Sequence, residues 1–170
     1  MILPYTKIIG LPVFDFKNQS QIGTVKDVII QAKDFKVSGF ILESSIFDRK
    51  TKVISSTDLI DIASQGVIAN DEDAVSTTEE NVRLKDAIKS GYHGIGQKVV
   101  TKSGKGIGKV IDLFISSETL EISKIHVKSV FIERIISRSA IIEIKKKKII
   151  VRDNFEAVQT GVPAMGPSVI

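Results

Sequence analysis

Cysteine and tryptophan are absent from this chain of 170 residues, and it contains only two tyrosines and four prolines. Without cysteine, disulfides, thiolate nucleophiles and thiolate metal sites are all excluded. No apolar run approaches the ~20 residues that a membrane-spanning helix needs. Residues 1–13 also lack the pattern of a secretory signal. We therefore expect a cytoplasmic protein with no transmembrane segment.

The apolar residues that are present are mainly isoleucine and valine. Hydrophobic residues make up 42% of the chain and charged residues 26%, which is typical of a folded globular protein. Because β-branched side chains suit a pleated, half-buried surface, this composition predicts an all-β fold. Charge is uneven: residues 1–75 carry 8 basic and 10 acidic residues (−2), and residues 76–170 carry 16 and 10 (+6). That excess predicts only a mild preference of the second half for anionic partners.

One sequence pattern occurs twice. Ile9–Val13 returns as Ile95–Val99, 86 positions later, and Ile22–Ile30 returns as Ile107–Ile115, 85 positions later. A one-residue change of offset across a turn is what the shortening of a hairpin loop produces. The duplication predicts two copies of one small module.

The repeat divides the chain into residues 1–75, a linker at 76–91, a second module at 92–156 and a C-terminal tail at 157–170. Each module is predicted to contain about five short strands separated by turn residues, as in a small sandwich or barrel. Glu79–Ser90 is predicted to be a connecting helix, because its apolar residues follow helical spacing and Gly91 can end it. The main strands are expected at Lys7–Val13, Gly23–Ile30 and Val37–Leu42, and at Gln97–Thr101, Gly108–Ile115, Ile122–Ser129, Ala140–Ile144 and Ile149–Arg152.

Both copies contain Ile-Gly-x-x-Val, then a turn, then Ile-Gly-x-Val-x-Asp at the start of an apolar strand. This pattern resembles the PRC-barrel family, over roughly residues 5–70 and 92–153. The resemblance implies two tandem, small, mostly antiparallel β-barrels joined by a short helix. The family includes a subunit of the photosynthetic reaction centre and part of a ribosome maturation factor. We expect the fold to carry over without those two roles.

Features that suggest catalysis have simpler explanations. Gly104–Lys109 is glycine-rich but lacks the spacing of a phosphate-binding loop, and a hairpin turn accounts for it. Asp27 and Asp112 occupy the same place in both copies, where a carboxylate is predicted to accept backbone N–H bonds and set the strand twist. His93 and His126 have no counterpart in the other copy. We expect no enzyme activity, metal or cofactor, and a structural role for Gly10, Gly23, Asp27, Gly96, Gly108 and Asp112.

Lys145–Lys148, between two Ile/Val-rich segments, is the strongest charged feature. These lysines either contact an anionic partner or block pairing of exposed strand edges, and both interpretations stay open. Phe47, in a loop unique to the first copy, is a possible anchor for a partner. The preferred function is a non-enzymatic protein-binding adaptor or assembly module, and the alternative is RNA- or ribosome-associated binding. The candidate partner-binding residues are Lys128, Arg134, Arg138, Lys145, Lys146, Lys147, Lys148 and Phe47.

Overall fold

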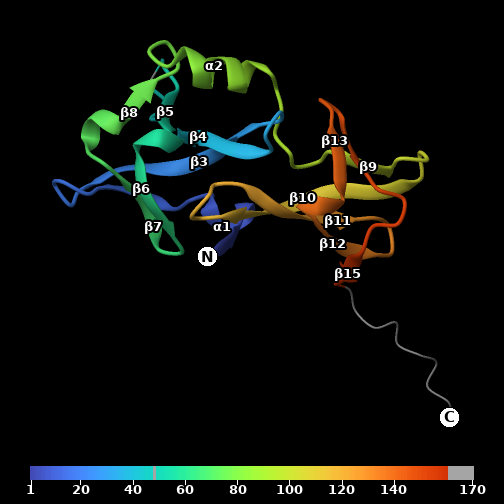
Figure 1. Cartoon of the computed structure of the whole chain (residues 1–170). Helices are drawn as coiled ribbons and strands as arrows, with labels where there is room; N and C mark the ends of the chain where they lie inside the picture. Colours follow the sequence, from blue (N-terminus) through green and yellow to red (C-terminus); the bar gives the residue numbers. More distant parts are fainter. Residues whose placement is uncertain (48, 161–170) are drawn as a thin grey trace.

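The computed structural model describes residues 1–47 and 49–160, which form mostly β structure (Figure 1). In the first half the strands are β1 (Ile2–Pro4), β2 (Pro12–Asp15), β3 (Gln21–Gln31), β4 (Lys36–Leu42), β5 (Lys52–Ser55), β6 (Leu59–Ala63), β7 (Gly66–Ala69) and β8 (Val75–Thr77). In the second half they are β9 (Lys98–Thr101), β10 (Gly106–Ser116), β11 (Ile122–Lys128), β12 (Glu133–Ser137), β13 (Ile141–Ile144), β14 (Lys148–Val151) and β15 (Ala157–Gln159). The helical segments are α1 (Tyr5–Ile8), α2 (Val82–Lys89), η1 (Ser56–Asp58), η2 (Glu72–Ala74) and η3 (Arg138–Ala140).

The strands form two sheets with the same strand order. One sheet runs β6-β7-β2-β3-β4-β5-β8, and the other runs β13-β14-β9-β10-β11-β12-β15. In each sheet a single pair is parallel, β2 with β7 and β9 with β14, and the other pairs along these orders are antiparallel. Of the predicted all-β fold, the predominance of strands is confirmed, and strand pairing follows the sequence repeat.

The longest strands, β3 and β10, carry the same irregularity. The register of β3 on β4 shifts between Val25 and Asp27, and that of β10 on β11 shifts between Val110 and Asp112. Such a bulge turns the following side chain away from strict alternation. Glycine precedes each bulge: at Gly108, with φ of 149°, a Cβ would lie 2.3 Å from the carbonyl oxygen of Lys128. No larger residue fits there without a shift of the backbone.

The two sheets meet at the ends of two equivalent hairpins. Phe35 and Leu120 occupy matching turn positions, and both have positive φ (51° and 59°). The N–H of Val37 donates to Leu120 O (2.8 Å), and the N–H of Ile122 donates to Phe35 O (3.1 Å). The bridge of Lys36 with Glu121 lies between these bonds. The halves are therefore related by an approximate two-fold axis at this contact.

One hydrophobic core runs through both halves. Val28 and Phe40 from the first sheet belong to the same buried cluster as Leu113 and Ile125 from the second. Each half is small for an independent core, so sharing one increases the apolar area that each removes from water.

The N-terminal segment crosses to the other half. β1 pairs antiparallel with β10, with Leu3 opposite Ile115, and α1 follows directly (Figure 1). In the first half, α2 lies instead over β3 and β4, where Leu84 is buried with Ile29 and Val53. The two-fold relation is therefore broken by a strand on one side and a helix on the other.

Several expected elements differ at their ends. The strand expected over Lys7–Val13 is wrong for its first part, because Tyr5–Ile8 is helical and β2 begins only at Pro12. The connecting helix begins at Val82, since the side chain of Asn81 accepts a hydrogen bond from the N–H of Leu84. Ala157–Gln159, assigned to the tail, forms β15 on β12. The rest of the predicted tail, residues 161–170, lies outside the described residues.

Candidate functional site

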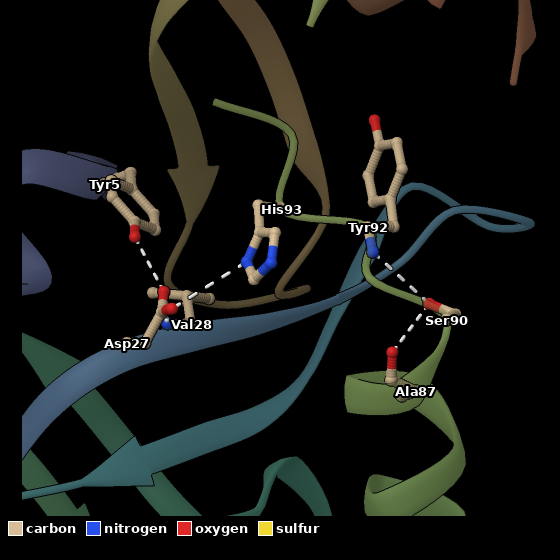
Figure 2. Close-up of polar contacts among 7 residues, drawn as sticks. All are labelled: Tyr5, Asp27, Val28, Ala87, Ser90, Tyr92 and His93. Carbon is tan, nitrogen blue, oxygen red and sulfur yellow. Dashed lines mark hydrogen bonds and ion pairs between the residues drawn. The ribbon is translucent and has the colours of Figure 1, made fainter. Parts of the chain in front are cut away.

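The repeated aspartates lie where the N-terminal segment passes between the halves. The hydroxyl of Tyr5 donates to Asp27 Oδ1 at 2.7 Å, and the N–H of Val28 donates to the same oxygen (Figure 2). In the second half, the N–H and hydroxyl of Thr6 both donate to the carboxylate of Asp112. Two consecutive residues of α1 therefore hold one aspartate of each copy.

The surroundings of Asp27 favour a positioning role. Burial, and then the hydrogen bond to Asp27, raise the pKa of Tyr5, so its phenol stays protonated. His93 Nδ1 lies 3.9 Å from Asp27 Oδ2, within ion-pair distance but too far for a hydrogen bond. A dashed line marks this pair in Figure 2. The cavity beside these residues has a volume of only about 20 Å³. That is room for about one water molecule.

A much larger hollow lies between α2 and the end of the β3–β4 hairpin. This groove has a volume of about 710 Å³. Apolar and polar side chains both line it, and its floor includes the buried Ile30 and Ser38. The lining residues are Ile30, Gln31, Ala32, Lys33, Ser38, Val82, Arg83, Asp86, Ala87 and Ser90.

The groove lies beside the C-terminal end of β3. In the second half, the equivalent end of β10 pairs with β1. There β9 pairs with β10 over Gly106–Lys109, and β1 pairs with β10 over Phe114–Ser116. On β3 the equivalent positions are Ile29–Gln31. Within the described residues, the only strand that pairs with this stretch is β4. This part of β3 is an open sheet edge.

The charge beside the open edge of β3 is opposite to the charge beside the equivalent edge of β10. The amine of Met1 lies 3.1 Å from Glu118 Oε1, and the N–H of Ser117 donates to Met1 O. Lys33 takes the place of Glu118 in the first half, and Arg83 lines the groove with it. Asp86 also lines the groove, so its charged lining residues sum to +1 (Lys33, Arg83 and Asp86). This balance favours a segment with a negative charge opposite Lys33, where β1 has a positive one.

The basic residues singled out from the sequence do not all lie in one patch. Arg138 lies at the contact between the halves, 5.6 Å from the ring centroid of Phe35. Arg134 Nη1 donates to Ile107 O, and Lys128 Nζ lies 2.8 Å from Glu133 Oε1. Lys145–Lys148 form the tight turn from β13 to β14, where the N–H of Lys145 donates to Lys148 O.

Phe47 is 85% exposed beside Ile46, which is 93% exposed. The loop at the same position in the second half, between β11 and β12, carries Val130 and Phe131 at 84% and 93%. Each half therefore presents an aliphatic residue and a phenylalanine on the same loop.

The glycines predicted to be structural lie at strand starts. Gly10 and Gly96 have positive φ (83° and 77°), and each donates its N–H to the valine before the bulge, Val25 or Val110. A Cβ on Gly23 would lie 2.9 Å from Leu42 Cδ1. In residues 1–47 and 49–160, no cluster of three or more His, Asp or Glu side chains is arranged to hold a metal ion.

Sequence reasoning missed the groove. Its walls come from a helix and a strand end that are far apart in the chain, and their residues carry no motif. The reversal from Glu118 to Lys33 at equivalent repeat positions was the one available signal.

The repeated strand order, the shared bulge and the glycines before it define a class of small, mostly antiparallel β domain. Residues 2–75 match the family model of the PRC-barrel domain, so the first half of the chain is a PRC-barrel domain. The resemblance predicted from the sequence is thereby confirmed for this half. No curated protein matches the chain. None of the helices in the described part of the chain is long and apolar enough to cross a bilayer.

Proposed function

We propose that this protein is a non-enzymatic protein-binding adaptor built from two PRC-barrel domains in tandem. The common strand order and bulge position support the assignment of the second half to the same domain type. The very small space beside Asp27 and the protonated Tyr5 support a role without catalysis.

This proposal is based on the open edge of β3. An extended segment of a partner protein adds to Ile29–Gln31 as a further strand, as β1 does on β10. Main-chain hydrogen bonds supply affinity, and an apolar side chain of the partner contacts Ala87 in the groove. An acidic residue of the partner faces Lys33 and Arg83, which sets its orientation.

The test is cross-linking and affinity capture of the full chain from nuclease-treated lysate of the native host, at roughly 0.15 M salt. Three forms are compared: the wild type, Lys33→Glu/Arg83→Glu, and the control Lys17→Glu/Lys26→Glu. All four side chains are exposed, so the fold tolerates both charge reversals.

We expect specific proteins to be captured by the wild type and the control but lost from the groove variant. Amide hydrogen exchange then locates the contact, with protection expected at Ile30 and Ala32. Partners captured equally by all three forms would disprove the role of the groove. The absence of any nuclease-resistant partner would disprove the adaptor function itself.

A further inference from the structure

Four lysines lie side by side across the second sheet, although they are far apart in the sequence. Lys148 on β14 is opposite Lys98 on β9, and Lys98 is opposite Lys109 on β10. Lys109 is in turn opposite Lys128 on β11. Since strands are about 4.8 Å apart, this lysine row extends over about 14 Å.

All four side chains point to the outer face of the sheet. Each lysine is exposed, while the residue beside it in the strand is buried in the core. These buried neighbours are Val99, Val110, Val127 and Ile149.

The row lacks neutralising partners over most of its length. Among the described residues, Lys128 alone has one, Glu133, and the hydrogen bond from this lysine lowers the pKa of that carboxyl. In residues 1–47 and 49–160, no carboxylate lies within ion-pair distance of Lys98, Lys109 or Lys148. Like charges directly opposite each other destabilise a sheet. The four neighbouring lysines therefore lower the stability of the free protein. A bound anion would neutralise their charge and so account for this arrangement.

The first half has no such row. Its equivalent positions are Gly66, Pro12, Thr24 and Glu43, which carry no positive charge. The common fold therefore does not require these lysines.

An exposed aromatic residue lies beyond one end of the row. Phe131 follows Lys128 by three residues, in the β11–β12 loop, and is 93% exposed. A positively charged track combined with an aromatic side chain is the arrangement that binds single-stranded nucleic acid.

We propose that the lysine row and Phe131 bind single-stranded nucleic acid, with successive phosphates on the lysines and one base stacked on the phenyl ring. This surface is separate from the groove beside α2, and the inference does not rest on the adaptor function.

The test is fluorescence anisotropy of a labelled 12-residue oligouridine with the purified full chain, between 50 and 200 mM KCl. Three or four phosphate contacts predict a slope of log affinity against log salt of about −2 to −3. Affinity then falls roughly 20- to 50-fold over this range. The variant Lys98→Gln/Lys109→Gln is expected to make the slope shallower by about 1.4.

Phe131→Ala separates stacking from charge. Loss of one stacked base is expected to weaken binding roughly 5- to 140-fold with the salt slope unchanged. The control Lys26→Gln/Lys89→Gln removes two exposed lysines elsewhere and is expected to bind as the wild type does. Circular dichroism of each variant establishes that it is folded.

Three results would overturn the inference. The first is a lack of binding to oligouridine at 50 mM KCl. The second is binding that the Lys98/Lys109 variant and its control weaken equally. The third is binding only to vesicles containing phosphatidylserine, assayed in parallel by co-sedimentation, which would assign the lysine row to a membrane surface. None of these results bears on protein partners captured after nuclease treatment.

Discussion

At the scale of single residues, the repeated aspartates are explained by position. Each follows a bulge in the longest strand of its half, so its carboxylate leaves the regular alternation and points toward α1. Tyr5 and Thr6 then supply hydrogen-bond donors for the two carboxylates. A buried acid or base for catalysis would need a substrate-sized space beside it, and the space beside Asp27 holds about one water molecule.

Two tyrosine variants test this account. In Tyr5→Phe, Asp27 loses a donor at 2.7 Å, and we expect the free energy of unfolding to fall by about 1 kcal/mol. The matched control is Tyr92→Phe, because the buried hydroxyl of Tyr92 has no hydrogen-bond partner among the described residues. Removing an unsatisfied hydroxyl is expected to be neutral or stabilising. Urea unfolding at pH 7 measures both, and an equal loss in the two variants would contradict the account.

At the scale of elements, β1 and α2 distinguish two otherwise similar halves. β1 extends the sheet of the second half along β10. In the first half, the chain that approaches β3 forms α2 instead, because Asn81 caps a helix whose apolar residues face Ile29 and Val53. The helix covers one face of the sheet, and among the described strands only β4 pairs with the end of β3. The groove therefore results from the packing of α2.

The attachment of α2 depends mainly on Leu84, which is buried between Ile29, Val53 and the backbone at Gly39. We expect Leu84→Ala to lower the free energy of unfolding by about 2–3 kcal/mol. The control Val82→Ala, on an exposed position of the same helix, is expected to change it by less than about 0.5 kcal/mol. Guanidinium unfolding measures both, and similar values would show that α2 is not held through Leu84.

At the scale of the whole molecule, two small sheets share one core. Phe35 is fully buried at the contact with the other half, and β1 and the hairpin bonds also cross the boundary. Neither half therefore keeps all of its buried apolar surface when alone.

This predicts that the polypeptide of residues 1–75 is markedly less stable than the full chain. Its Phe35 would face water, and its β1 would lose β10 as a partner. Thermal unfolding followed by circular dichroism checks the prediction. A transition of the isolated half as cooperative and as high as that of the full chain would show that the shared core contributes little.

Much of this architecture is predictable from the sequence, because its signals are local. Isoleucine and valine content indicates strands, and the two copies of Ile-Gly-x-Val-x-Asp indicate two equivalent strand pairs. The family of the first half follows from the same residues. The start of the chain was harder to predict: residues 5–8 resemble a strand in composition but form a helical turn whose side chains reach both aspartates.

The amino-acid sequence by itself determined the β-rich fold, the duplication and the positive charge of the second half. Only the tertiary structure decided which lysines lie side by side, because strand register joins Lys148, Lys98, Lys109 and Lys128 from four separate segments. It also decided that β1 covers the edge of β10, whereas no strand in the described part of the chain covers the equivalent edge of β3. Hydrophobic patterning identifies the buried face of each strand, whereas contacts between strands depend on long-range packing that no short segment encodes.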